Sequence, residues 1–245
     1  MTMKQSIKNI SLLAILSLGI LAGCGDDPAA PTPTGEVSIS TSLTTKTVSS
    51  TYEKGGSVTA GPTCDSVVIS RVRFVFSDLK LHIDDDSSNS NDDKGMIKSG
   101  PVLMEYLPGS SVSSASASIP TGTFNHIKYE IHKLDDSKSS DTAAFNDPAY
   151  ADFVTGGRYT YIIEGLIWNS NSAVAFTFKS SKNENLNLDL DTPVTVVENT
   201  VAPITLAFDP TGLFKHGAKP LDPRYEENRN DIEKMVKDAF HALKK

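Results

Sequence analysis

Apolar and polar residues alternate with a period of two along most of this chain, and this alternation constrains its fold more than any other feature. In segment 37–43, Val, Ile, Thr and Leu alternate with serine. In segment 125–132, Ile127, Tyr129 and Ile131 alternate with polar or charged residues. Because successive side chains of a β-strand point to opposite faces, both patterns predict half-buried strands.

Further apolar segments extend the pattern, at 68–76, 79–83, 159–168, 174–178, 186–190 and 204–208. About eight or nine short strands separated by Ser- and Thr-rich turns predict a mainly β protein. We expect a single antiparallel two-sheet β-sandwich over residues 36–215. The run 159–168 is almost continuously apolar, so we expect a central strand that is buried on both faces.

The period changes to that of a helix near the C-terminus, within residues 216–245. Asp222 and Pro223 suit the N-cap and the first turn of a helix. Apolar residues then recur at helical spacing, at Ile232, Met235, Val236, Ala239, Phe240 and Leu243. This stripe predicts a C-terminal amphipathic α-helix of about five turns that packs on the sandwich. A helix that faces a partner or a membrane is the alternative, although the mixed charge of its polar face disfavours anionic lipid.

Residues 1–23 have the features of a secretory signal peptide. Lys4 and Lys8 precede an apolar stretch. This stretch is too short for a transmembrane helix, which needs about 20 apolar residues. The sequence Leu-Ala-Gly-Cys that ends at Cys24 is similar to the lipobox of bacterial lipoproteins. That resemblance implies that Cys24 becomes the first mature residue and carries thioether-linked lipid and an N-acyl chain such as palmitate. A plain signal peptide with a nearby cysteine is the alternative.

Residues 24–35 predict an extended tether between the lipid and the body, because their three prolines favour extended backbone. The chain carries 30 acidic and 23 basic residues, for a net charge of -7. This excess of acid argues against nucleic-acid binding and favours a body held away from an anionic bilayer. Asp26 and Asp27 also resemble the acidic surface-export signal of some diderm lipoproteins. We therefore expect an extracytoplasmic protein anchored to a bacterial membrane, above all the outer membrane, on its periplasmic or surface face.

Several stretches are similar to a family of secreted lipoproteins. Residues 119–124 (IPTGTF) and 127–129 resemble the hairpin of uncharacterised DUF4382-like lipoprotein domains. Residues 161–190 and 221–240 resemble secreted β-sandwich lipoproteins of the Bacteroidota and Chlorobi type. The resemblance covers most of the mature chain and implies a lipid-anchored, prealbumin-like or related β-sandwich without an agreed activity. Some relatives by architecture are copper-associated periplasmic proteins, but no motif here carries that role over residue by residue.

The densest group of acidic residues, at 84–93, is the first candidate for a metal site. Its sequence DDDSSNSNDD offers the oxygen ligands that calcium prefers, with candidates Asp84, Asp86, Asp92 and Asp93. The run lacks the glycine position and the closing glutamate of an EF-hand. A solvated turn between strands is the alternative.

Histidines offer a second, copper-type metal site. His126 and His132 share one face of a strand but lie about 20 Å apart, which is too far to bind one ion. His82 is the candidate ligand, because a neighbouring strand could bring it close to either of them. The alternative is that these histidines are solvated residues on the outer face.

The longest connection, at 135–157, holds three aromatic residues among polar ones, namely Phe145, Tyr150 and Phe153. Loops longer than about 12–15 residues are uncommon unless they are functional or disordered. Exposed aromatic rings would suit contact with a glycan or a protein. The alternative is that the loop folds back and its rings plug the surface of the sheet.

No segment carries a catalytic motif, since GxSxG, HExxH, P-loop and Rossmann glycine patterns are absent from the sequence. Cys64 is unpaired once Cys24 carries lipid, and we expect it to be buried. We therefore expect a non-catalytic binding or structural role in the cell envelope, with a protein or glycan partner and no cofactor. Binding of calcium or a copper-type metal is the alternative, and a hydrolase with dispersed residues ranks last.

Overall fold

The computed structural model describes residues 32–45, 47–49, 61–82, 96–98, 100–216 and 219–244. They belong to one compact unit that starts at Thr32. The signal peptide, Cys24 and most of the tether lie outside the described residues, as do Asp84, Asp86, Asp92 and Asp93. The first strand begins at Thr34, slightly before the predicted end of the tether.

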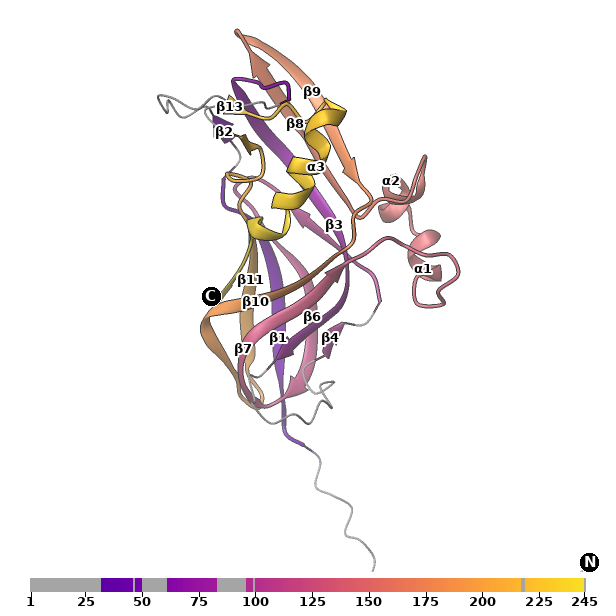
Figure 1. The fold of residues 1–245 in the computed structure, drawn as a ribbon. Helices are drawn as coiled ribbons and strands as arrows, with labels where there is room; N and C mark the ends of the chain where they lie inside the picture. The colour runs from indigo at the N-terminus through magenta and orange to yellow at the C-terminus, as the bar shows by residue number, and fades with distance from the viewer. Residues whose placement is uncertain are drawn as a thin grey trace, which may run out of the picture. The chain divides into compact units, whose positions relative to one another are not determined.

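Strands dominate the described residues and confirm the mainly β prediction (Figure 1). The strands are β1 (Thr34–Leu43), β2 (Thr47–Ser49), β3 (Ser66–His82), β4 (Met96–Lys98), β5 (Val102–Tyr106), β6 (Ser111–Pro120), β7 (Gly122–Ile131), β8 (Tyr161–Asn169), β9 (Ser172–Ser180), β10 (Glu184–Val196), β11 (Val201–Phe208), β12 (Lys215–His216), β13 (Lys219–Pro220) and β14 (Phe240–Lys244). The helices are α1 (Thr142–Phe145), α2 (Ala151–Val154) and α3 (Glu226–Met235), with short 3-10 helices η2 (Pro148–Tyr150) and η3 (Lys237–Ala239).

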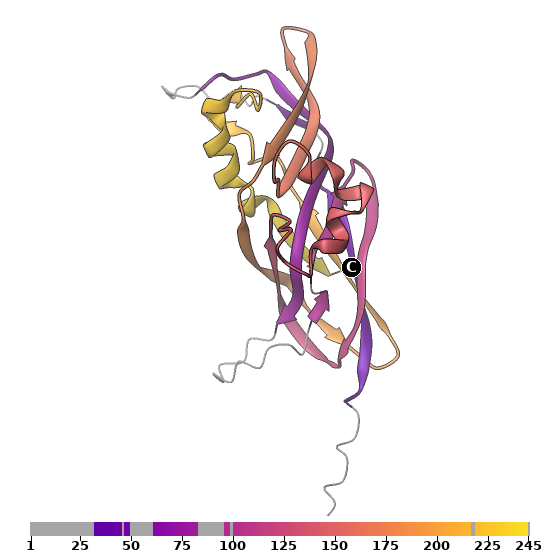
Figure 2. The same ribbon diagram turned by 90° about the vertical axis from the view of Figure 1, so that its right-hand side faces the viewer.

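Within the described part of the chain, twelve strands form one continuous sheet, while β12 and β13 pair separately. The main order is β6-β1-β11-β14-β10-β7-β3-β8-β9, and β2, β4 and β5 pair with parts of β3. β1 runs parallel to β11 and β10 runs parallel to β14, whereas the other pairs are antiparallel. The sheet is therefore mixed, and it curls into a half-barrel (Figures 1 and 2).

The predicted two-sheet antiparallel sandwich is not confirmed, and β14 supplies the physical reason. This strand lies between β11 and β10, so it connects the strands on its two sides into one sheet. Residues Phe240 to Lys244 pair with β11, and Ala242 also pairs with Leu190 of β10. Without β14, the described strands β11 and β10 would not be neighbours in a common hydrogen-bonded sheet.

The C-terminal helix is shorter than the sequence predicts. The α-helix ends at Met235, and the backbone turns to an extended conformation at Phe240 (φ -93, ψ 139). Residues 240–244 alternate buried and exposed, as a strand does. The predicted helix of about five turns is therefore wrong at both ends. Its N-cap is Tyr225 instead of Asp222. Its second half forms a strand, because the apolar residues there fit both periods and the free positions beside β11 and β10 favour a strand.

The core-facing residues of β3 change between odd and even positions twice along the strand. On the face toward the main core, the buried residues are Val67 and Ile69, then Val72, Phe74 and Phe76, then Leu79 and Leu81, while Arg73, Val75 and Ser77 are buried on the opposite face. Pairing with β8 shifts between Ile69 and Arg71, and pairing with β7 shifts between Ser77 and Lys80. Such bulges bend a strand and increase its twist, so they help the long β3 to follow the curl of the sheet. The simple alternation predicted for 68–76 is wrong at its start, because Val67 and Ile69 are buried while Val68 is only half-buried.

Aromatic rings fill the centre of the core. The Phe240 ring centroid lies 4.9 Å from that of Phe74 and 5.1 Å from that of Phe208. The ring centroids of Phe76 and Tyr129 each lie 5.8 Å from the centroid of Phe240. β14 therefore contributes both backbone pairing and the central side chain of this cluster. Among the described residues, no helix has the length and apolar character needed to cross a bilayer.

Candidate functional site

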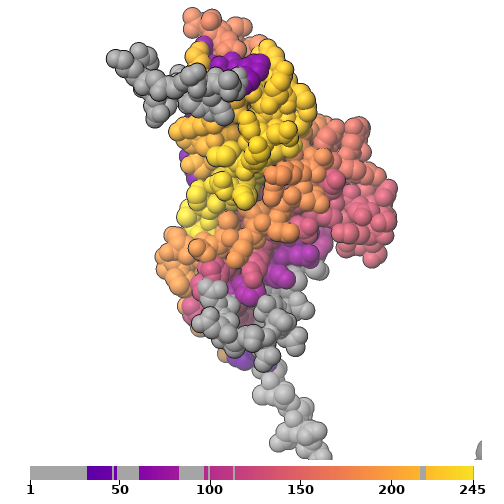
Figure 3. Space-filling model, viewed as in Figure 1, coloured from indigo at the N-terminus to yellow at the C-terminus, as the bar shows by residue number. Residues whose placement is uncertain are grey.

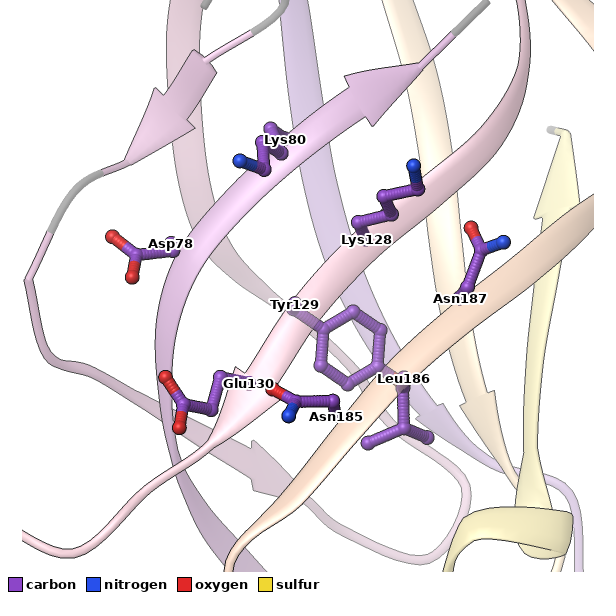
Figure 4. Close-up of a pocket in the computed structure, with 8 residues that line it drawn as sticks. All are labelled: Asp78, Lys80, Lys128, Tyr129, Glu130, Asn185, Leu186 and Asn187. Atoms are coloured by element: carbon purple, nitrogen blue, oxygen red, sulfur yellow. The ribbon is translucent and has the colours of Figure 1, made fainter. Parts of the chain in front are cut away.

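A concave site lies on the outer face of the sheet, where β3, β7 and β10 run side by side (Figure 4). Its volume is about 330 Å³, within the lower range of small-ligand pockets. Eight residues line it: Asp78, Lys80, Lys128, Tyr129, Glu130, Asn185, Leu186 and Asn187. We call it the β3–β7–β10 pocket. A larger hollow of about 420 Å³ between β1, β6 and β11 is lined mostly by Ser, Thr, Gly and Ala, with Glu36 as its charged residue.

The bulge in β3 shapes this pocket. Asp78 adopts a left-handed backbone conformation (φ 51), which is uncommon for a residue other than glycine. Pairing between β3 and β7 shifts at this point, so Ser77 and Lys80 pair with Glu130 and Lys128. Tyr129 and Leu186 lie between the polar side chains in Figure 4, but both are nearly buried, and the Tyr129 ring packs in the core against Phe76 and Phe240.

Polar side chains form rows across the three strands. Lys80 of β3 lies directly opposite Lys128 of β7, which lies directly opposite Asn187 of β10. In the next row, Glu130 lies opposite Asn185 and accepts a hydrogen bond of 3.4 Å from the Ser77 hydroxyl. The pocket therefore offers two ammonium groups, two amides and the two carboxylates of Asp78 and Glu130.

The two lysines are the chemically distinctive part of the pocket. Like charges directly opposite each other on paired strands destabilise a sheet. Among the described residues, neither Lys80 nor Lys128 has a carboxylate within ion-pair distance. An anion held between the two ammonium groups would relieve their repulsion and accept charge-assisted hydrogen bonds from both.

The histidines divide into two separate environments. His82 lies directly opposite His126, as the sequence allowed, and His126 lies directly opposite Asp189. The His126 Nδ1 atom is 2.7 Å from an Asp189 carboxylate oxygen. These three residues form the row beside the two lysines. Across the described residues, no group of three or more His, Cys, Asp or Glu side chains is arranged to hold a metal ion.

His132 is buried rather than solvated, which corrects the outer-face interpretation for this residue. Its Nε2 atom lies 2.9 Å from an oxygen of Asp141, which is also buried. Burial alone would raise the pKa of Asp141. The Asp135 backbone N–H, His132 and the Ser140 hydroxyl outweigh burial, so the pKa lies below its ordinary value. This pair anchors the start of the long connection and is remote from His82 in the strand register.

The aromatic residues of segment 135–157 pack onto the sheet. Phe153 is fully buried and Tyr150 is 8% exposed, in a cluster with Val75 and Ile162. Phe145 is half-buried beneath the Arg158 guanidinium, whose carbon lies 4.4 Å from the ring centroid. The proposal that Phe145, Tyr150 and Phe153 form an exposed ligand loop is therefore wrong, because burial of apolar area on the sheet outweighs their exposure.

Arg73 connects that segment to the sheet. Its guanidinium is almost buried and lies 2.8 Å from Asp152 of α2 and 3.4 Å from Glu164 of β8. The side chain of Arg73 also stacks on Phe153, 5.6 Å from the ring centroid. The network is structural, because its central charge faces protein groups and little solvent.

Cys64 is buried and unpaired in the described residues. Its Sγ atom lies 3.7 Å from the Pro220 carbonyl oxygen. Burial, with the nearby carboxylates of Asp222 and Asp65, raises the pKa of the thiol to about 12. Since the thiolate is the reactive form, this cysteine is suited to packing and not to nucleophilic chemistry.

Comparisons with known proteins give this chain no relatives: no family model, no curated protein and no solved structure matches it.

Proposed function

We propose that this protein is a lipid-anchored protein of the bacterial cell envelope with a non-catalytic binding role. Its ligand is an acidic sugar unit of a glycan, bound in the β3–β7–β10 pocket. The lipobox ending at Cys24, the preceding signal sequence and the Pro-rich tether support the anchor. The observation that carries the binding role is the Lys80–Lys128 pair, two directly opposed cations without a carboxylate partner among the described residues.

The chemistry of the pocket favours a carboxylate that is attached to a polyol. Ammonium groups donate strong hydrogen bonds to carboxylate oxygens. The amides of Asn185 and Asn187 can both donate to and accept from sugar hydroxyls.

Calorimetric titration of the purified full chain with galacturonate and with galactose tests this function. We expect heat with the acidic sugar only. Replacing Lys80 or Lys128 by Gln should weaken binding about tenfold or more, since hydrogen bonds between charged groups contribute about 1.5–3 kcal/mol. Lys215, exposed on β12, provides the matched control Lys215→Gln, which should bind as the parent does.

Binding of both sugars alike, or loss of binding in the Lys215 control, would contradict the assignment to this pocket. If an acidic protein segment competes with galacturonate, the pocket remains the binding site but its ligand is a protein instead of a glycan.

Metal binding is the second candidate function, and one observation favours it. His82 and His126 lie directly opposite each other, and an Asp189 carboxylate oxygen lies 2.7 Å from Nδ1 of His126. A carboxylate beside the second ring nitrogen is typical of metal-binding histidines. The resemblance to copper-associated architectures points the same way, and calcium remains the candidate for segment 84–93.

Titration of the full chain with copper and then with calcium separates these ions. If His126 is a copper ligand, His126→Asn abolishes the copper heat, whereas His241→Asn at an exposed position of β14 preserves it. Absence of heat with both metals would remove this second candidate.

A further inference from the structure

β9 is the last strand at one end of the main sheet. Each of its nine residues pairs with β8 without a shift in register, from Ser172 opposite Asn169 to Ser180 opposite Tyr161. None of the described strands pairs with its other side. The tip of the β8–β9 hairpin projects beyond α3 in both views of the fold and in the space-filling view (Figures 1, 2 and 3).

The turn determines which backbone groups face outward. Ser170 and Asn171 both have positive φ (47 and 71), as in a two-residue type I′ turn. The flanking residues of such a turn form a hydrogen-bonded pair, and hydrogen-bonded and non-hydrogen-bonded pairs then alternate. It follows that Ala173, Ala175 and Thr177 direct their N–H and C=O groups away from β8.

Residue Lys179 follows the same alternation and shows how far the open edge extends. Its carbonyl oxygen accepts a hydrogen bond of 2.7 Å from Nη1 of Arg229 on α3. α3 therefore covers the edge at Lys179. The open part of the edge is the stretch from Ser172 to Phe178.

This open stretch lacks the devices that usually protect a strand edge. Natural edges carry lysine, proline or a bulge that prevents pairing with another chain. Residues 172–178 contain neither charge nor proline, and their pairing with β8 has no bulge. Leu166 and Trp168 of β8 are each 38% exposed beside it, and Val174 is 43% exposed on the other face.

We propose that β9 pairs with β9 of a second copy of this chain, in antiparallel orientation and centred on Ala175. In this register Ala175 faces its counterpart and Ala173 faces Thr177, so every outward N–H and C=O of these residues finds a partner. Lys179 lies beyond the paired stretch, so no like charges oppose each other. Val174 gains contact with Phe176 of the second copy, which covers apolar surface that is exposed in one copy alone.

The antiparallel register fixes how the two copies are oriented. The start of β1 and the β8–β9 turn lie at opposite ends of the described unit (Figures 1 and 2). The two copies therefore run in opposite directions. Such pairing joins copies in solution or on facing surfaces, and not neighbours that stand upright on one membrane.

Charge exchange at Ala175 tests the pairing, with sedimentation of the full chain in detergent as the measurement. The parent chain should form a dimer. Ala175→Lys and Ala175→Glu should each remain monomeric, because each places two like charges directly opposite each other. A mixture of the two variants should restore the dimer. Ser116→Lys, at an exposed position of the opposite edge strand β6, is the matched control and should dimerise as the parent does.

The fluorescence of Trp168 provides an independent measurement of dimer formation, because this residue is the only tryptophan of the chain. Its emission should shift to shorter wavelength as the parent chain is concentrated, and it should stay constant in Ala175→Lys. The side chain at 175 is exposed, so thermal unfolding of the variants should match that of the parent at low concentration. A parent chain that stays monomeric, a Lys variant that still dimerises, or a mixture that fails to pair would each overturn the proposal.

Discussion

At the scale of residues, the site depends on side chains that the sequence did not single out. His82 was a candidate, and the structure places it opposite His126, one row from the pocket. Lys80 and Lys128 looked like ordinary solvated positions of two strands, because their opposition depends on the register between β3 and β7. One signal was available: the apolar positions change from even numbers at Phe74 and Phe76 to odd numbers at Leu79 and Leu81. A change of phase within one strand indicates a bulge.

The opposed lysines predict an unusual effect of removing a charge. Lys128→Gln should raise the free energy of unfolding by about 0.2–1 kcal/mol in the absence of ligand, since it removes a like-charge pair from directly opposite positions. Urea denaturation at low ionic strength measures the difference. Added salt should diminish it, because both side chains are partly exposed and salt screens them.

Lys215→Gln serves as the control for this measurement and should change stability little. A loss of stability in Lys128→Gln would show that the lysine is compensated by a negative group, and the argument for a bound anion would then fail.

At the scale of elements, the prediction succeeded where local pattern and tertiary pairing agree. β1 and β7 match the predicted segments closely because alternation identifies them, and β8 lies where the apolar run predicts a strand. The expected burial of that strand on both faces is wrong in its second half, since Leu166 and Trp168 are each 38% exposed next to the edge strand β9. The helix predicted for the end of the chain is wrong, because the pattern of residues 240–244 fits both a helix and a strand. Only the unpaired edges of β11 and β10 favour the strand. For the aromatic residues of segment 135–157, the sequence leaves a ligand loop and rings that plug the sheet as alternatives, and their burial on a distant sheet surface favours the plug.

Phe240 and Leu243 distinguish the strand from the predicted helix, in which both would lie on the buried stripe. In the structure Phe240 is 3% exposed and Leu243 is 38% exposed. Phe240→Ala should therefore cost about 3–5 kcal/mol, as truncation of a buried aromatic ring does. Leu243→Ala should change the free energy of unfolding by no more than about 0.5 kcal/mol, as is usual at the surface. If urea denaturation shows that both variants lose the same free energy of unfolding, the predicted helix is favoured.

Phe153 provides the corresponding test for segment 135–157. Phe153→Ala should cost about 3–5 kcal/mol in urea denaturation, because the ring is fully buried against Arg73 and the sheet. Phe145→Ala should cost clearly less, since that ring is only half-buried. Galacturonate binding by the folded variants should be unchanged. If the variants bind galacturonate more weakly but keep the free energy of unfolding of the parent, these rings contact the ligand.

At the scale of the whole molecule, the mainly β class could be predicted and the topology could not. Alternation reports that a strand has a buried face, but it does not report which strand lies beside it. The parallel pairs β1–β11 and β10–β14 join residues far apart in sequence, and no local feature of the chain encodes them. The N-terminal signals are different, because a lipobox is read by processing enzymes from the sequence itself and needs no fold.

The envelope location underlies the choice of a glycan ligand, so the chemical state of Cys24 is the most direct test. Intact-mass and peptide mass spectrometry of the protein extracted from the membranes of its native cells measures that state. The account predicts a chain that begins at Cys24 and carries acyl chains on that residue. A chain that still contains residues before Cys24, with no fatty acid attached, would contradict it.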